Sequence, residues 1–235
     1  MRERIKIDRR FCGPPDSGNG GYVCGLAAGF IDGAAEVTLR KPPPLEQSLE
    51  LERIGKKILF RDQNHIVAEV RPAILELAVP NPPTYAEAKE AAKLYPGFKE
   101  HVFPTCFVCG PERAEGDGLR IFPNTIPMKN LVAAPWIPDD SLADDNGKVR
   151  PEFLWSALDC PGGWAVTVTK PRPIVLGRLA ACVDNRIKPG EQCVVIGWEI
   201  GADGRKLYSG SAVFSESGKL CGKAKATWIE VSLPT

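Results

Sequence analysis

Two stretches of the chain are apolar without the period-two alternation of a half-buried strand. Residues 19–31 and 150–165 each open with polar or conformationally special residues, continue as an apolar run, and are followed by β-type sequence. This pattern favours a buried helix over a strand. We predict helices over residues 22–31 and 152–158, each central to a sheet, with Pro161-Gly162-Gly163 ending the second helix.

Alternating apolar and polar residues after each of these helices predict strands. Hairpin turns are expected at Asp62-Gln63-Asn64, Asp203-Gly204 and Ser217-Gly218. A helix followed by four β segments occurs twice, which indicates a duplicated domain. The predicted strands are residues 5–10, 35–40, 47–54, 58–61, 66–71 with an extension over 73–79, 119–122, 130–137, 174–183, 192–200, 206–214 and 220–231.

The repeated order of elements divides the chain into three parts. The first repeat is predicted to cover residues 1–80 and the second residues 119–235, with residues 81–118 as a helical and loop linker. A helix over residues 84–95 is expected in the linker. Its first residue, Thr84, precedes Glu87 by three positions, which is the spacing of a capping box.

Charge and composition restrict the class of protein. The 30 basic and 29 acidic residues leave a net charge of +1, without the basic excess of a nucleic-acid-binding protein. No apolar run approaches the roughly 20 residues of a membrane span, and residues 1–10 lack the apolar segment of a signal peptide. The eight cysteines therefore indicate buried reduced thiols. We expect a cytoplasmic globular protein that binds no nucleic acid and does not span a membrane.

Short motifs in the two predicted helices resemble those of one family. Residues 17–28 (SGNGGYVCGLAA) resemble the helix entry of acyl-CoA thioesterase-like hotdog proteins, with Asn19 where a histidine often precedes the two glycines, Gly20 and Gly21. Leu158-Asp159 resembles the Leu-Asp on the central helix of PaaI-type thioesterases.

The linker adds a third motif. Residues 106–110 (CFVCG) followed by residues 118–121 (GLRI) are similar to a segment that precedes the first strand in some of these proteins. In this order the motifs resemble a tandem hotdog protein over nearly the whole chain. The resemblance implies an α+β fold, a double hotdog in which two central helices are each wrapped by a curved antiparallel β-sheet and the two copies pair edge to edge.

Each half departs from the family pattern in a different place. The first helix has Ala28 where a carboxylate would fall by counting from its two glycines, and the second has Asp159 but opens with Arg150-Pro151-Glu152. In a paired hotdog the cleft between the halves draws on both helices. The resemblance therefore implies one intact site, shared between the halves, and one degenerate site.

The catalytic candidates are Asp159, Gly20 and Gly21. A carboxylate in an apolar groove serves as a general base towards water or as a nucleophile on a thioester carbon. Unpaired amides at a helix N-terminus stabilise the developing negative charge on the thioester oxygen. The alternatives are an exposed aspartate at a helix end and glycines that only interrupt a loop. The substrate-binding candidates are Asn19, which would alternatively cap the first helix, Tyr22, Trp155 and Glu152.

Cys106-x-x-Cys109 supplies half of a zinc site. No second C-x-x-C occurs, the only histidines are His65 and His101, and a complete site would have to recruit Cys12 or His101 from elsewhere in the fold. A redox pair is also disfavoured, because no βαβ pattern surrounds it. We therefore predict no metal site, and no cofactor apart from the CoA that is part of the substrate.

The resemblance implies an acyl-CoA thioesterase-like hydrolase that acts on an acyl-CoA or acyl-carrier thioester and forms a homo-oligomer, such as a dimer, through its hotdog sheets. Because the motifs are split between the halves, a non-catalytic acyl-thioester or lipid-binding hotdog protein is the alternative. An enoyl-thioester hydratase or dehydratase is less well supported, since the Tyr…Asn-x-Asp…His segment of hotdog hydratases is absent. No G-x-S-x-G, P-loop or G-x-G-x-x-G motif occurs.

Overall fold

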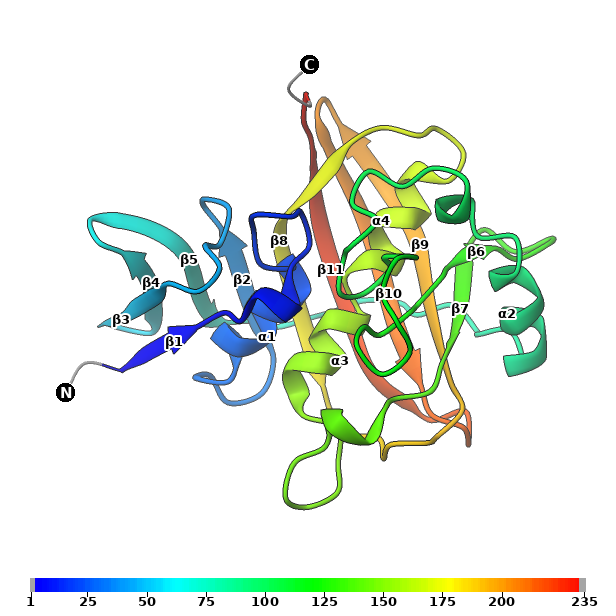
Figure 1. The fold of residues 1–235 in the computed structure, drawn as a ribbon, viewed down its shortest axis with the longest axis horizontal. Coiled ribbons are helices and arrows are strands. Elements are labelled where there is room, and N and C mark those ends of the chain that lie inside the picture. The colour runs from blue at the N-terminus through cyan, green and yellow to red at the C-terminus, as the bar shows by residue number, and fades with distance from the viewer. Residues whose placement is uncertain (1–2, 233–235) are drawn as a thin grey trace.

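Strands from both halves of the chain join in one antiparallel sheet. The computed structural model describes residues 3–232, and within this range eleven strands pair in the order β1-β3-β4-β5-β2-β8-β11-β10-β9-β7-β6 (Figure 1). The strands are β1 (Arg4–Lys6), β2 (Ala35–Leu39), β3 (Ser48–Ile54), β4 (Lys57–Asp62), β5 (His65–Pro72), β6 (Asn124–Thr125), β7 (Val132–Trp136), β8 (Ile174–Val183), β9 (Cys193–Asp203), β10 (Lys206–Phe214) and β11 (Leu220–Glu230).

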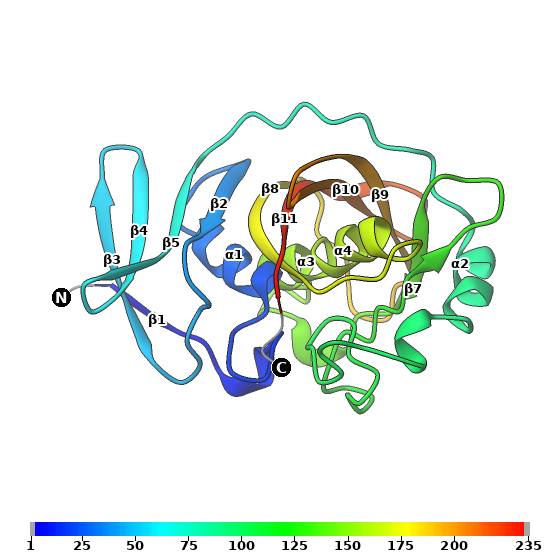
Figure 2. The same cartoon turned by 90° about the horizontal axis from the view of Figure 1, so that it is seen from above.

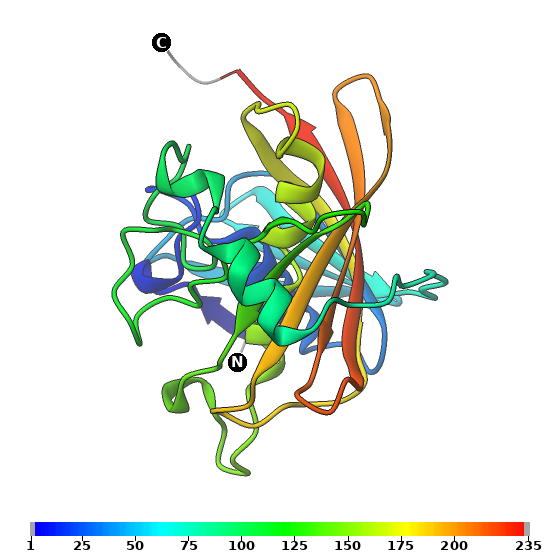
Figure 3. The same cartoon turned by 90° about the vertical axis from the view of Figure 1, so that its right-hand side faces the viewer.

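Three α-helices lie on the inner side of this sheet and a fourth lies at its far edge. Figure 2 shows β8 to β11 curving around α3 and α4, with α1 beside β2. The same view shows α2 next to β7 and apart from the other helices, and Figure 3 shows α2 nearest the viewer. None of the helices within residues 3–232 combines the length and the apolar character needed to cross a membrane. The helices are α1 (Gly20–Ala28), α2 (Tyr85–Ala92), α3 (Pro151–Ala157) and α4 (Cys160–Thr167).

The two halves meet where β2 pairs with β8. Val37 lies opposite Leu179 in this antiparallel pair, and both side chains are fully buried. Their neighbours Thr38 and Arg178 point to the other face of the sheet, where the Arg178 Nε donates a hydrogen bond to the Thr38 Oγ1 at 3.1 Å. This is the alternation that the sequence pattern predicts. It makes the sheet continuous across the junction between the halves.

Helices α1 and α3 cross at backbone contact distance. A Cβ atom on Gly21 would lie 2.8 Å from the Trp155 carbonyl oxygen, and one on Gly25 would lie 2.6 Å from the Glu152 Cα. Since rising residue numbers on α1 meet falling numbers on α3, the two helices run antiparallel. The two glycines, four residues apart on one face of α1, permit this approach because they carry no side chain.

The second predicted helix, residues 152–158, is confirmed as α3, but the break predicted at Pro161-Gly162-Gly163 is wrong. The helical path breaks at Asp159, and these three residues lie in the first half of α4. Proline is tolerated in the first turn of a helix, where its missing N–H has no intrahelical acceptor. The two glycines let α4 lie close to the sheet, since a Cβ on Gly162 would be 2.6 Å from the Ser209 Oγ.

Other element predictions were confirmed or corrected by the structure. The capping box is present at α2, where the Glu87 N–H donates to the Thr84 Oγ1 and the Glu87 carboxylate accepts from the Thr84 N–H. Residues 119–122 are not a strand, because the Leu119 and Ile121 N–H groups donate to carbonyls in the cysteine loop, those of Phe107 and Val108.

Two further strands were predicted too long. Residues 73–79 form no strand, and the first strand ends at Lys6, before a 3-10 turn over Arg9–Phe11 that the Asp8 carboxylate caps. The remaining strands and α1 are confirmed within a few residues. The division into two repeats and a linker stays a prediction. Its outermost positions, residues 1–2 and 233–235, lie outside the described range.

An ion pair fastens the loop that leads into α3. The Arg186 Nη2 lies 2.6 Å from the Asp144 Oδ2, and the Arg186 Nε donates to the Val149 carbonyl. The hydrogen bond from Arg186 lowers the pKa of Asp144 from its ordinary value of 3.8 to about 2. A depressed carboxyl pKa stabilises the fold above the unfolded-state pKa, and this stabilisation is lost as the pH falls towards the folded-state pKa.

We expect Asp144→Asn to lower the midpoint of thermal unfolding at pH 6. The difference from the wild type should narrow as the pH falls from about 4 to about 2, since protonation removes the same charge from the wild type. Asp145→Asn, at the exposed neighbouring aspartate, is the control and should change the midpoint little. A difference that stays constant down to pH 2 would contradict the role assigned to the ion pair.

Candidate active site

Asp159 occupies the junction between α3 and α4. Its backbone (φ −79°, ψ −80°) breaks the helical path, and its N–H donates to the Ser156 carbonyl at 3.1 Å. The side chain is 3% exposed, so it points into the interior and not to solvent as an aspartate at a free helix end would. The junction therefore delivers a carboxylate into the contact between the two halves.

The N-terminus of α1 holds this carboxylate from the opposite half of the chain. The Gly21 N–H donates to the Asp159 Oδ2 at 2.8 Å, and the Asn19 Nδ2 donates to the same oxygen at 3.1 Å. Asn19 also caps α1, because its Oδ1 accepts from the Tyr22 N–H at 2.9 Å. The other carboxylate oxygen, Asp159 Oδ1, is buried and has no hydrogen-bond partner within the described chain.

Burial dominates the ionisation of Asp159. Desolvation raises the pKa of its carboxyl from the ordinary value of 3.8 to about 7, and the neighbouring Cys106 adds to the increase. The hydrogen bonds from Gly21 and Asn19 act in the opposite direction, since they favour the charged form. The site thus combines an apolar surrounding with two donors aimed at one carboxylate oxygen.

The remaining predicted substrate-binding residues surround the crossing of the helices. Tyr22 stacks on Phe11, with ring centroids 4.1 Å apart, and burial followed by the Glu152 charge raises the pKa of its hydroxyl to about 12. Trp155 is 4% exposed and contacts α1 through its backbone carbonyl and its Cβ. Glu152 lies at the far end of the crossing, 3.5 Å from the Arg150 Nε. These three residues pack the helix pair around the carboxylate.

Gly20 and Gly21 differ in what their amides can do. The Gly21 N–H already donates to Asp159, whereas the Gly20 N–H has no protein acceptor within residues 3–232. Gly20 is also half-exposed, as is Cys160 next to Asp159. The start of α1 therefore presents an unpaired N–H at a partly exposed position.

The opposite end of the helix pair carries no comparable group. The position predicted to be degenerate on α1 is Ala28, which is buried, and α3 begins with Pro151, which has no N–H to donate. The Arg150 side chain makes no capping hydrogen bond there. The arrangement of donors and carboxylate thus exists once in the described chain.

Sequence reasoning missed the cysteine loop as a neighbour of this site. The Asn19 Nδ2 lies 3.7 Å from the Cys106 Sγ, so the linker reaches the same carboxylate environment. The motif C-x-x-C-G was visible in the sequence, but nothing in its spacing indicates that it folds against α1 and Asp159. The loop joins this site through a contact that spans 87 residues.

Comparison with known proteins supports the architecture. No protein-family model matches the sequence, and no curated protein matches it. Solved structures of similar fold include a candidate thioesterase from Novosphingobium aromaticivorans, at 10% identity over 98% of this chain and 96% of that chain, with a TM-score of 0.63. The tesB protein of Mycobacterium avium subs paratuberculosis is 12% identical over 98% and 93%, with a TM-score of 0.62. A candidate thioesterase II from Thermobifida fusca is 13% identical over 98% and 92%, with a TM-score of 0.64.

These similarities extend over almost the whole of each chain, and at such low identity they establish the fold. The protein shares the fold of these solved structures, with one large antiparallel sheet and few helices. The resemblance found in the sequence motifs is therefore confirmed at the level of the fold.

Proposed function

We propose that the protein is an acyl-CoA thioesterase-like hydrolase, built as a double hotdog in which α1 belongs to one unit and α3 with α4 to the other. One observation carries this proposal: the Asp159 carboxylate of one half is held by the Gly21 N–H of the other half at 2.8 Å. This pairing completes across the two halves a site that neither helix contains alone.

The chemistry follows from the two carboxylate oxygens. Gly21 and Asn19 hold Oδ2, which leaves Oδ1 to act as a base towards water or as a nucleophile on the thioester carbon. Either route passes through a tetrahedral intermediate whose oxygen becomes negative. The Gly20 N–H, at the positive end of α1, is the donor we assign to this oxygen. Collapse of the intermediate breaks the carbon–sulfur bond and expels the thiolate of CoA or of a carrier. On the base route this releases the carboxylic acid, and the proton that Asp159 took from water passes to the thiolate. On the nucleophile route it leaves a mixed anhydride on Asp159, which a water molecule then hydrolyses.

The assignment of the oxyanion donor differs from the sequence-based prediction. Both glycines were expected to serve the thioester oxygen, but the Gly21 N–H is already used by Asp159. We propose Gly21 as the residue that positions the carboxylate, and Gly20 as the oxyanion donor. Because Asp159 is only 3% exposed, a thioester reaches Oδ1 only after side chains around Gly20 and Cys160 move aside.

The burial of the Asp159 carboxylate is the observation that favours the second candidate, a non-catalytic acyl-thioester-binding protein. A panel of acyl-CoA substrates of increasing chain length distinguishes the two, with release of the free thiol measured alongside binding by calorimetry. We expect hydrolysis of at least one acyl-CoA with saturation kinetics. Binding without thiol release across the panel would support the second candidate, and neither binding nor release would contradict both.

Three further expectations accompany the proposal. We propose that the chain consists of repeats over residues 1–80 and 119–235 joined by the linker over residues 81–118. We also propose a cytoplasmic location and a homo-oligomer formed through the sheets. Light scattering coupled to gel filtration tests the last point, since a monomeric mass at micromolar concentration would contradict it.

A further inference from the structure

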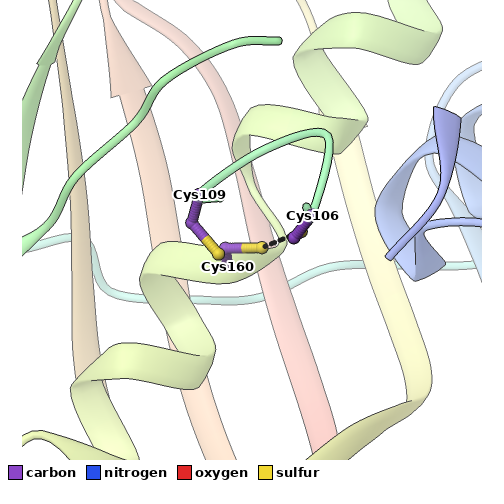
Figure 4. Close-up of side chains that lie close together, drawn as sticks. All are labelled: Cys106, Cys109 and Cys160. Atoms are coloured by element: carbon purple, nitrogen blue, oxygen red, sulfur yellow. Dashed lines mark hydrogen bonds between the residues drawn. The ribbon is translucent and has the colours of Figure 1, made fainter. Parts of the chain in front are cut away.

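Three cysteine sulfurs converge beside Asp159. Cys106 and Cys109 lie in the linker loop, and Cys160 is the first residue of α4. Their Sγ atoms all lie within 4.8 Å of one another, and those of Cys106 and Cys160 are 3.8 Å apart (Figure 4). Within residues 3–232 no other group of three or more histidine, cysteine or carboxylate side chains comes together in this way.

The loop is shaped to present its two sulfurs. The Cys106 N–H donates to the Phe103 carbonyl and the Gly110 N–H donates to the Cys106 carbonyl, both at 2.9 Å. A Cβ on Gly110 would lie 2.5 Å from the Cys106 backbone nitrogen, so this tight bend needs glycine. Leu119 and Ile121 then pair with the same loop and fix it from the other side. The sulfurs therefore meet on a constrained backbone.

The sulfurs lie close together in a buried environment, where a positive charge would stabilise their thiolate forms. Cys106 and Cys109 are each 4% exposed. Three thiolates buried this close together would repel one another unless a cation lies between them.

We propose that Cys106, Cys109 and Cys160 bind a zinc ion. Zinc prefers thiolate ligands at about 2.3 Å in a tetrahedral arrangement, which places neighbouring sulfurs about 3.8 Å apart. The observed separation of the Cys106 and Cys160 sulfurs, 3.8 Å, already has this value. Soft sulfur donors disfavour magnesium and calcium, which take oxygen ligands. The site differs from the sequence-based expectation of no metal because its third ligand, Cys160, was not among the partners considered.

His101 contributes to the site as a hydrogen-bond donor. Its Nε2 lies 3.3 Å from the Cys109 Sγ, and its Nδ1 accepts from the Phe103 N–H at 2.9 Å. Since Nδ1 accepts, the neutral ring carries its proton on Nε2 and directs it at the sulfur. The hydrogen bond from His101 to the Cys109 sulfur would orient a zinc ligand without contacting the metal, and bonds of this kind tune metal affinity.

The metal would fasten the linker to the catalytic region without taking part in hydrolysis. Cys160 follows Asp159 directly, and the Cys106 Sγ lies 3.7 Å from the Asn19 Nδ2. A zinc ion that bridges the loop and α4 would fix the position of the α3–α4 junction relative to the N-terminus of α1. This inference is independent of the proposed hydrolase activity, because it depends only on the sulfur geometry.

Metal content after purification under reducing conditions tests the inference. We expect roughly one zinc ion per chain, retained through dialysis and removed by a strong chelator with a lower midpoint of thermal unfolding. Cobalt added to the metal-depleted wild type should give the near-ultraviolet thiolate-to-cobalt bands and the intense visible bands of a tetrahedral thiolate site. This measurement requires no variant, so it stands even where a substitution impairs folding.

Single variants Cys106→Ser, Cys109→Ser and Cys160→Ser should each reduce bound zinc to background. Cys182→Ser is the matched control, because Cys182 lies on β8, outside the cluster. His101→Phe should weaken zinc binding about 10- to 100-fold and keep the thiolate-to-cobalt bands. Three outcomes would overturn the site: a folded, reduced wild type that retains no zinc and gives no cobalt bands, equal zinc content in Cys160→Ser and Cys182→Ser, or a Cys106–Cys160 disulfide in protein purified without oxidant.

Discussion

Replacing Asp159 by asparagine is expected to lower kcat for acyl-CoA hydrolysis by about 100-fold or more, the usual range for loss of a general base or nucleophile. Asparagine has nearly the same shape and its oxygen still accepts the Gly21 N–H, which donates to Asp159 at 2.8 Å. The second carboxylate oxygen, which is free of partners in the wild type, becomes an amide nitrogen that cannot accept a proton. Binding of the substrate should change much less than kcat.

Steady-state kinetics of both proteins with the best acyl-CoA of the panel measure this effect. Asp145→Asn makes the same chemical change at an exposed position and should retain the wild-type rate. Circular dichroism should show that Asp159→Asn is folded. A folded Asp159→Asn protein with full kcat would show that the carboxylate does no chemistry, and the site assignment would fail.

Replacing Gly25 by alanine is expected to destabilise the fold by up to about 2 kcal/mol. Alanine improves helix propensity by about 1 kcal/mol, but overpacking a contact costs about 1–3 kcal/mol. The new Cβ would lie 2.6 Å from the Glu152 Cα and 2.8 Å from the Trp155 Cβ. Because the first of these atoms is backbone, α1 and α3 must separate, and the steric cost exceeds the gain in propensity.

Urea denaturation followed by tryptophan fluorescence measures the loss of stability. Gly29→Ala, at the C-terminal end of α1, is the matched control. A Cβ there would be 3.3 Å from the Leu26 carbonyl oxygen and would contact no other helix. We expect its stability to equal or exceed that of the wild type. Equal stability of Gly25→Ala and Gly29→Ala would contradict the view that the glycines exist to let the helices approach.

The Gly25→Ala variant also tests how the site is assembled. Separation of the helices at Gly25 should lengthen the contact between Gly21 and Asp159, one helical turn away on the same face. We therefore expect Gly25→Ala to lower kcat at temperatures where the protein remains folded. Gly29→Ala should leave kcat unchanged, since a Cβ there would contact no atom of α3.

Local patterns in the sequence determined most of the secondary structure. The alternation of apolar and polar residues placed β2 to β5 and β8 to β11 within a few residues of their observed bounds. The Thr84 and Glu87 pair identified the capping box of α2. These features depend on neighbours within one turn or one strand, so the information lies in a short window of sequence.

The sequence also identified Asp159 and the Gly20-Gly21 pair as candidate site residues through their resemblance to family motifs. Their proximity could not be read from the sequence, because the Gly21–Asp159 hydrogen bond joins residues 138 apart. Which glycine amide is free, and which holds the carboxylate, depends on where the helix crossing places the backbone. That crossing is set by packing between elements and not by the composition of either element.

Tertiary structure alone decided the continuation of α3 into α4 and the position of Cys160. A Pro-Gly-Gly sequence ends a helix in isolation, but here packing against β9 and β10 stabilises a new helix that begins before the proline. The same packing brings Cys160 to the two linker cysteines. Local sequence determines which conformation each segment prefers, whereas contacts between distant segments determine which of those preferences the folded chain keeps.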